Sequence, residues 1–200
     1  MIRKFVLGAL FLITGTLPAL AHLDPLEHGS LAAGFSHPLF GADHVLAMVA
    51  VGLWAALLAQ SAGRQALWLV PTAFVGTMLA GFAAALGGLH LPVVEPVILA
   101  SVVVIGLLAA AALSLPVAAA MAMVGFFAFF HGHAHGGEIG EAGAWPYAAG
   151  FAIATAILHA AGGGAGLLLG SLLGTAQGRM AARVAGAAAA LGGVWLAIGG

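Results

Sequence analysis

The sequence has no cysteine and very few charged side chains. Its 200 residues include five Lys and Arg and six Asp and Glu. Only 6% of the residues are therefore charged, whereas soluble domains carry about 25%. The absence of cysteine excludes disulfide scaffolds and metal sites built on thiolates. A formal net charge of −1 provides no basic surface for nucleic acid. The chain also lacks a G-x-x-x-x-G-K-[ST] motif, so nothing in it supports ATP hydrolysis.

Hydrophobic residues make up 63% of the chain, too many for the surface of a soluble globule. Six apolar runs, each close to the roughly 20 residues that cross a bilayer core, predict transmembrane helices near 38–62, 66–87, 93–114, 116–134, 145–168 and 180–198. Glycine, with 31 residues, and alanine suit close packing of such helices. We therefore predict an all-α, polytopic bundle in the lipid bilayer, with a single six-helix transmembrane domain over residues 22–200.

Residues 1–21 have the pattern of a cleaved signal peptide. Arg3 and Lys4 precede a short apolar stretch, which ends in the small-residue cleavage pattern Ala19-Leu20-Ala21. The alternative is a first transmembrane helix that stays attached to the chain. Cleavage would place the mature N-terminus in the periplasm, and six spans would return the C-terminus to the same side.

The few cationic residues of the mature chain agree with this orientation. Arg64 follows the first predicted span, and Arg179 and Arg183 lie between the fifth and sixth spans. Both connections are cytoplasmic in the predicted topology, as the positive-inside rule requires. We therefore expect a multi-pass protein of the bacterial inner (cytoplasmic) membrane, with most carboxylates and imidazoles at its outer face.

Histidine is unusually frequent, with nine residues, and the first cluster is His37, Asp43 and His44. Pro38 favours a helix start with His37 at the cap position. On an unbroken helix the seven residues from His37 to His44 span about 10.5 Å, too far for both rings to bind one ion. Unwinding at Pro38 and Gly41 would bring them together. The alternative is a polar helix cap with Asp43 hydrogen-bonded locally, although such polar pairs in membrane helices are usually functional.

The second cluster follows the fourth span and consists of His131, His133, His135 and Glu138. His131 and His135 project from one face of a helix about one turn apart, a spacing that suits two imidazoles on one metal ion. Glu138 either follows the same face or is brought in by Gly136-Gly137, whereas His133 points elsewhere, to a supporting position or to solvent. The alternative is a histidine-rich interfacial loop without a site.

Three further histidines are possible accessory residues. His159 lies deep in the fifth span, where it is either an interhelical hydrogen-bonding residue, or a lower ligand or proton relay. His22 would be the new N-terminus after cleavage, and its imidazole and α-amino group could chelate a divalent cation, with His28 nearby. The alternative for this segment is a short hydrated arm.

The ligand types narrow the choice of metal. Imidazole suits Zn, Cu, Fe and Ni, and Cu(I) is disfavoured because the chain has no cysteine. Ni(II), Co(II) and Zn(II) therefore remain, as bound or transported ions and not as catalytic cofactors.

At these clusters the chain resembles the HupE/UreJ family of hydrogenase/urease accessory membrane proteins, which are regarded as nickel or cobalt permeases. The resemblance lies in three motifs: His37-Pro-Leu-x-Gly-x-Asp43-His44, Leu46-Ala-Met48-x-Ala-Val-Gly-Leu-Trp54 and Phe130-His131-Gly-His133-Ala-His135-Gly-x-Glu138. It implies that the first motif recognises the metal and that the histidines and Glu138 of the third are its partner set.

The expected function is secondary transport of Ni(II) or Co(II), without ATP, for the supply of metalloenzymes. A metal-delivery protein on either side of the membrane is a possible partner. Two alternatives remain open. One is an intramembrane metal-dependent hydrolase, with Ser36 beside His37; the other is a metal sensor or accessory protein that moves no ion.

Overall fold

The protein is a bundle of α-helices. The computed structural model describes residues 30–139 and 143–199. Within these ranges the helices are α2 Leu31–Phe40, α3 Ala42–Ala62, α4 Ala66–Leu86, α5 Val94–Ala111, α6 Val117–Ile139, α7 Ala144–Leu173 and α8 Thr175–Ala197. The six from α3 to α8 are long and apolar enough to cross a membrane. The predicted all-α membrane bundle is confirmed, whereas the predicted signal peptide lies outside the described residues.

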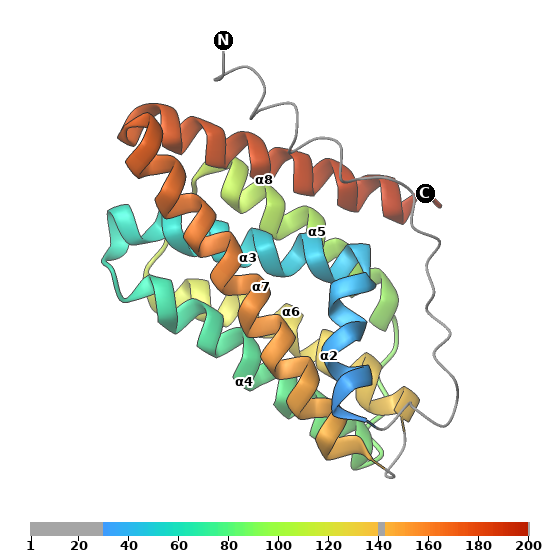
Figure 1. Ribbon diagram of the computed structural model, residues 1–200. Helices are drawn as coiled ribbons and strands as arrows, with labels where there is room; N and C mark the ends of the chain where they lie inside the picture. Colours follow the sequence, from blue (N-terminus) through green and yellow to red (C-terminus); the bar gives the residue numbers. More distant parts are fainter. Residues whose placement is uncertain (1–29, 140–142, 200) are drawn as a thin grey trace.

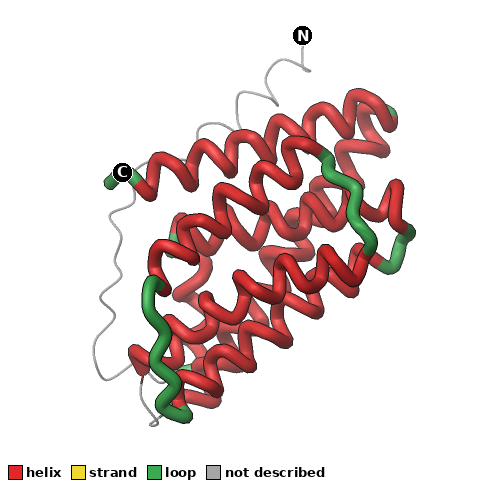
Figure 2. The backbone as a smooth tube through the Cα atoms, turned by 180° about the vertical axis from the view of Figure 1, so that it is seen from behind, coloured by secondary structure: helices red, strands yellow, loops and turns green. Residues whose placement is uncertain are grey.

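Helix α3 occupies the centre of the bundle. Helices α5 and α8 pack against each other on one side of it, and α7, with α4 and α6, covers the other side (Figure 1). The short helix α2 packs against the first half of α7. Seen from behind, the connecting loops gather at the two ends of the bundle (Figure 2). The chain thus forms antiparallel spans with polar groups concentrated at their ends.

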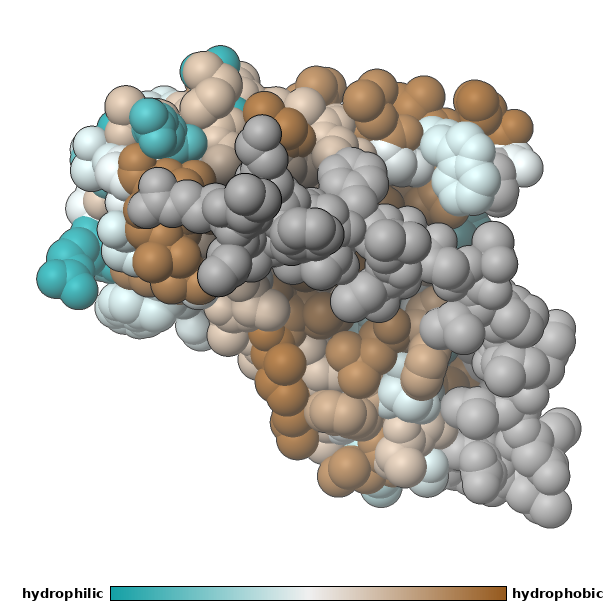
Figure 3. All heavy atoms as spheres, turned by 45° about the horizontal axis from the view of Figure 1, so that its top comes forward, coloured by the Kyte–Doolittle hydropathy of each residue, from teal (hydrophilic) through white to brown (hydrophobic). Residues whose placement is uncertain are grey.

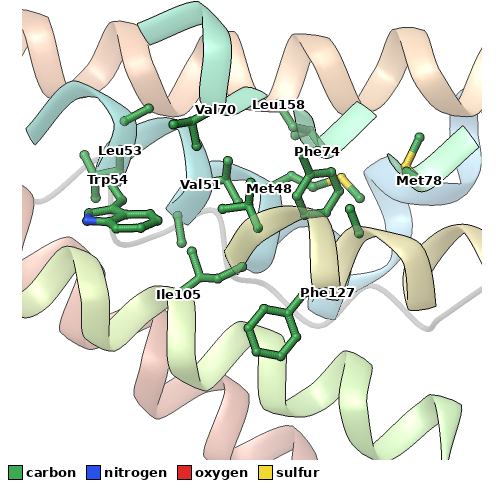
Figure 4. Close-up of a cluster of buried hydrophobic side chains, with 14 of the residues drawn as sticks. Met48, Val51, Leu53, Trp54, Val70, Phe74, Met78, Ile105, Phe127 and Leu158 are labelled. Atoms are coloured by element: carbon green, nitrogen blue, oxygen red, sulfur yellow. The ribbon is translucent and has the colours of Figure 1, made fainter. Parts of the chain in front are cut away.

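The interior and the exterior are both apolar, as expected for a protein whose solvent is lipid. Met48, Val51 and Trp54 of α3 are fully buried against Phe74 of α4 and Ile105 of α5 (Figure 4). Large hydrophobic side chains also cover the outside of the helices, and Figure 3 shows many of them on one face. Hydrophobicity alone therefore does not separate core from surface in this chain.

Glycines let two helix pairs approach at backbone distance. On α6, a Cβ atom at Gly132 would overlap the backbone of Met78 on α4. On α7, a Cβ atom at Gly162 would overlap the backbone of Val49 on α3, and Gly52 of α3 lies equally close to the backbone of His159. Such contacts replace the hydrophobic driving force that helices lack in lipid. They fix α4 against α6 and α3 against α7.

The glycine run at 162–164 could have bent or ended the fifth span. The structure shows instead one continuous helix of 30 residues, which ends at Gly174. At this residue φ is 81°, a left-handed conformation that glycine adopts at little cost. The helix is about 45 Å long, so it exceeds a hydrocarbon core of about 30 Å.

The arginines and the histidine clusters lie at opposite ends of the bundle. Helix α3 begins beside His44 and ends next to Arg64, and α8 begins in the turns that carry Arg179 and Arg183. Arg183 donates a hydrogen bond from Nε to the backbone carbonyl of Ala110, at 2.7 Å. This places a cation at the C-terminal end of α5, where the helix dipole favours it.

Candidate metal centre

The first histidine motif lies on a break between α2 and α3. Pro38 is inside the last turn of α2, and Gly41 is extended, with φ −80° and ψ 114°. The amide of Gly41 donates to the carbonyl of His37 at 3.1 Å, which closes α2. The prediction that His37 caps a helix start was wrong, because the chain is already helical from Leu31. The predicted break is found at Gly41, whereas Pro38 remains helical.

The break brings together two rings that a straight helix would separate. The ring centroids of His37 and His44 are 5.2 Å apart. His135 of α6 joins them: its Nε2 lies 2.8 Å from Nε2 of His44, and its ring centroid lies 4.3 Å from that of His37. One nitrogen from each of the three rings lies within 4.8 Å of the other two. We call His37, His44 and His135 the outer cluster.

The outer cluster has the dimensions of a metal site. Nitrogen ligands at about 2.0–2.1 Å from an ion lie roughly 3 Å from each other, close to the 2.8 Å between His44 and His135. Both of these side chains are buried, with exposed fractions of 4% and 5%, and His37 is half-buried. The cluster is therefore shielded on one side and reachable through His37 on the other.

Asp43 acts on the cluster through His44. Its Oδ2 lies 2.9 Å from Nδ1 of His44. A carboxylate accepts, so Nδ1 of His44 carries the proton, and its Nε2 accepts a hydrogen bond from Nε2 of His135 with the lone pair that would bind an ion. Asp43 also lies in the first turn of α3, where a negative charge is favourable. It therefore orients one ligand and supplies a negative charge near a bound cation.

Replacing this carboxylate tests its role directly. We expect Asp43→Asn to lower the affinity for Ni(II) by about 10- to 100-fold, because His44 loses its charged hydrogen-bond partner. Equilibrium dialysis of the purified full chain with radiolabelled Ni(II) measures this affinity, and the thermal unfolding midpoint checks the fold. An affinity within threefold of wild type, with the fold intact, would contradict the assignment.

His131 lies next to the cluster and is held by a serine on α5. Its ring centroid is 5.2 Å from that of His44, and its Nε2 lies 2.9 Å from Oγ of Ser101. The Ser101 hydroxyl donates to the carbonyl of Ile98 at 2.6 Å, so Oγ accepts from Nε2 of His131. The lone pair of His131 is then on Nδ1, which is buried and has no hydrogen-bond partner in the part of the chain that the structure describes. His131 is thus a fourth candidate ligand nitrogen beside the outer cluster.

Sequence reasoning missed Ser101. The only signal in the sequence was a single serine in an apolar span. Such serines commonly donate a hydrogen bond to the backbone of their own helix, as Ser101 also does.

Sequence reasoning also missed Phe151 of α7, whose ring centroid lies 4.9 Å from that of His135 and 5.9 Å from that of His44. Phe151 is fully buried and forms an apolar wall on one side of the cluster.

The structure does not bring His133 into the cluster. Although His133 is buried, its Nε2 donates to the backbone carbonyl of Leu89 at 2.7 Å. Leu89 lies in the connection between α4 and α5, so this hydrogen bond ties that loop to α6. Since His133 is two residues from both His131 and His135, it projects from a different side of the helix.

Three predicted residues cannot be placed against the cluster. Position 138 belongs to α6, but the side chain of Glu138 is outside the described part of the structure. His22 and His28 also lie outside the described residues. Their roles stay predictions.

His159 lies deeper in the bundle, on α7. It is 1% exposed, and neither of its ring nitrogens has a hydrogen-bond partner within residues 30–139 and 143–199. Its ring meets that of Phe74 edge to face, with centroids 4.9 Å apart. Among the described residues His159 forms no interhelical hydrogen bond, and both interpretations from the sequence stay predictions.

Comparison with known proteins agrees with the motifs. The family model for the HupE/UreJ protein matches residues 10–196. The chain is also 45% identical over 186 residues to Protein HupE of Rhizobium leguminosarum bv. viciae, an alignment that covers 92% of this chain and 93% of the relative. No solved structure matches the chain. The family match and this identity extend over almost the whole length, so the chain belongs to the HupE/UreJ family.

Proposed function

We propose that this protein is a secondary permease that moves Ni(II) or Co(II) across the bacterial inner membrane to supply metalloenzymes. The observation that carries the proposal is the outer cluster, where imidazoles from three helices converge at one end of the membrane spans. Ionisable groups within membrane helices are costly and usually mark an ion pathway. A purely structural role would not require three rings with facing nitrogens.

The chemistry of the cluster favours a borderline transition metal. Its ligands are imidazole nitrogens, with Asp43 as the supporting carboxylate, and no thiolate is available in the chain. Zn(II) satisfies the same preferences, and membership of a family regarded as nickel or cobalt permeases favours Ni(II) and Co(II). A permease must also release its cargo, so a site of a few neutral imidazoles suits transport better than a closed thiolate cage.

The orientation follows from the charges. With the three arginines in the cytoplasm, the outer cluster faces the periplasm and receives the ion there. The signal peptide would be cleaved after Ala21, and both termini of the mature chain would be periplasmic. Uptake then proceeds from the outer cluster toward the arginine end of the bundle.

Uptake of radiolabelled Ni(II) or Co(II) into proteoliposomes that contain only this protein tests the proposal. We expect time-dependent uptake by the wild type and at least a tenfold lower initial rate for Asp43→Ala and for His131→Ala. His90→Gln is the matched control, because His90 is exposed in the connection between α4 and α5. Normal uptake by both site variants would show that the site assignment is wrong.

Other outcomes identify the alternative functions. Metal binding without uptake by the wild type would favour a sensor or accessory protein. Metal-dependent turnover of lipid would favour the hydrolase. In the structure the hydroxyl of Ser36, the residue considered for that reaction, donates to the carbonyl of Ala33 within α2.

A further inference from the structure

A groove runs along the outside of the bundle between α4 and α7, which lie side by side (Figure 1). It has a volume of about 710 Å³ and is lined by the first half of α4 and the second half of α7, toward the arginine end. Helix α4 packs mainly against α6 and α7 mainly against α3, so the two helices meet little along this line. Gly76 of α4 and Gly164 of α7 are exposed in the groove, and a Cβ atom at either position would meet nothing within 4 Å. The groove is therefore open to the lipid.

The lining of the groove suits a hydrocarbon chain. Its walls are mostly apolar and include Leu67 and Pro71 on α4 and Ala160 and Leu167 on α7. The rise of the helix from Leu67 to Gly76 is about 14 Å, which is close to half of the roughly 30 Å hydrocarbon core of a bilayer. The groove thus has the length of the acyl-chain region of one leaflet.

A cationic residue lies at the end of this groove. Arg64 precedes α4, and its backbone carbonyl accepts a hydrogen bond from the amide of Leu67 at 3.2 Å. This bond closes one tight turn, so Arg64 lies on the same side of the backbone as Leu67, which lines the groove. Trp68 also lines the groove and is 60% exposed. Because tryptophan prefers the level of the lipid headgroups, Trp68 marks where the groove meets the membrane surface.

The charge of Arg64 is not neutralised by the protein. Across the segments that the structure describes, its guanidinium forms neither a hydrogen bond nor an ion pair. The acidic side chains in those segments, Asp43 and Glu95, lie in the first turns of α3 and α5, at the opposite end of the bundle. Arg183, in contrast, donates to the carbonyl of Ala110. An exposed guanidinium beside an apolar groove complements a phosphate that carries an acyl chain.

We propose that this groove binds an acyl chain of an anionic phospholipid, whose phosphate pairs with the guanidinium of Arg64. A zwitterionic headgroup brings its own cation, which competes with Arg64 for the phosphate, so an anionic headgroup binds more tightly. The lipid comes from the leaflet at the arginine end, and its chain fills the space that Gly76 and Gly164 leave open. The inference does not depend on metal transport, because it uses only the membrane surface of the protein.

Quenching of Trp68 fluorescence by brominated lipids measures this binding. The full chain is reconstituted in vesicles with Trp145→Phe and Trp195→Phe, which leaves Trp68 and the fully buried Trp54 of the four tryptophans. Brominated phosphatidylglycerol diluted into phosphatidylcholine, and the reverse mixture, give the relative binding constant of the two lipids beside Trp68. We expect phosphatidylglycerol to bind at least fivefold more tightly.

Two pairs of variants in this background separate the charge from the groove. Arg64→Gln should reduce the preference for phosphatidylglycerol to less than twofold. Arg179→Gln removes an exposed charge at the same end but outside the lining, and should keep the fivefold preference. Gly164→Leu fills the groove and should lower the quenching of Trp68 by brominated phosphatidylglycerol at least twofold. Gly170→Leu is its matched control, because Gly170 lies on the same helix outside the lining and a Cβ atom there also meets nothing within 4 Å.

The opposite results would overturn the proposal. If the two lipids bind equally, or if Arg64→Gln keeps the full preference, Arg64 does not hold the phosphate. If Gly164→Leu and Gly170→Leu are quenched alike, the acyl chain does not occupy the groove. If neither brominated lipid quenches Trp68, no lipid lies there, and a disulfide-linked dimer of Gly164→Cys would identify a second copy of the chain as the occupant.

Discussion

His44→Ala and His135→Ala are each expected to weaken Ni(II) binding by at least about 100-fold. Each removes one imidazole of the outer cluster, whereas removal of a group that only supports a ligand typically costs about 10- to 100-fold. Equilibrium dialysis with radiolabelled Ni(II) measures the affinity. Because the two nitrogens are 2.8 Å apart and would bind one ion, the double variant should lose much less than the product of the two single losses.

His133→Ala is the matched control for this prediction. It removes an imidazole from the same motif and the same helix, but one that donates to the carbonyl of Leu89 outside the cluster. We expect its Ni(II) affinity to stay within threefold of wild type and its unfolding midpoint to fall. A loss of affinity as large as that of His135→Ala would show that the ligands are wrongly assigned.

Gly162→Ala is expected to destabilise the protein by about 2 kcal/mol, within the usual range for overpacking. The added methyl group would overlap the backbone carbonyl of Val49, so α3 and α7 would have to move apart. For a chain of this size the change corresponds to a fall of about 4–8 °C in the thermal unfolding midpoint. Because α3 carries His44 of the outer cluster, Ni(II) uptake should fall as well.

The same glycine run provides the control. Gly164 is two residues further along α7, and a Cβ atom there would meet nothing within 4 Å. Gly164→Ala should therefore leave the midpoint unchanged or raise it, since alanine favours a helix over glycine by up to about 1 kcal/mol. Equal midpoints for the two variants, measured by tryptophan fluorescence in detergent, would refute the packing argument.

The membrane spans could be predicted because length and hydropathy alone determine them. All six predicted runs overlap the six long helices, and the differences lie at the ends. The first span, α3, starts at Ala42 and so later than the predicted residue 38, because the helix before the break at Gly41 is the separate helix α2. Proline is most common in the first turn of a helix, so Pro38 predicted a helix start. Here Pro38 lies in the last turn of α2, and the packing of α2 against α7 stabilises this helix.

The candidate site was only partly predictable because its contacts join distant helices. The spacing of His131 and His135 places both on one face, but it cannot show that His135 meets His37 or that Ser101 holds His131. Likewise, the sequence contains both Phe74 and His159 and gives no sign of their contact. These pairings depend on which helices are neighbours, and close backbone contacts at particular glycines determine this.

The division of the histidines among the helix pairs has a mechanical consequence. Helices α4 and α6 form one body fixed by glycine contacts, and α2, α3 and α7 form another. His135 and Phe74 belong to the first body, whereas His37, His44 and His159 belong to the second. A single rotation of one body against the other therefore changes the ligand distances of the outer cluster and the contact of Phe74 with His159 at the same time. The geometry of the outer cluster and the Phe74–His159 contact are thus coupled, because both lie between the same two groups of helices.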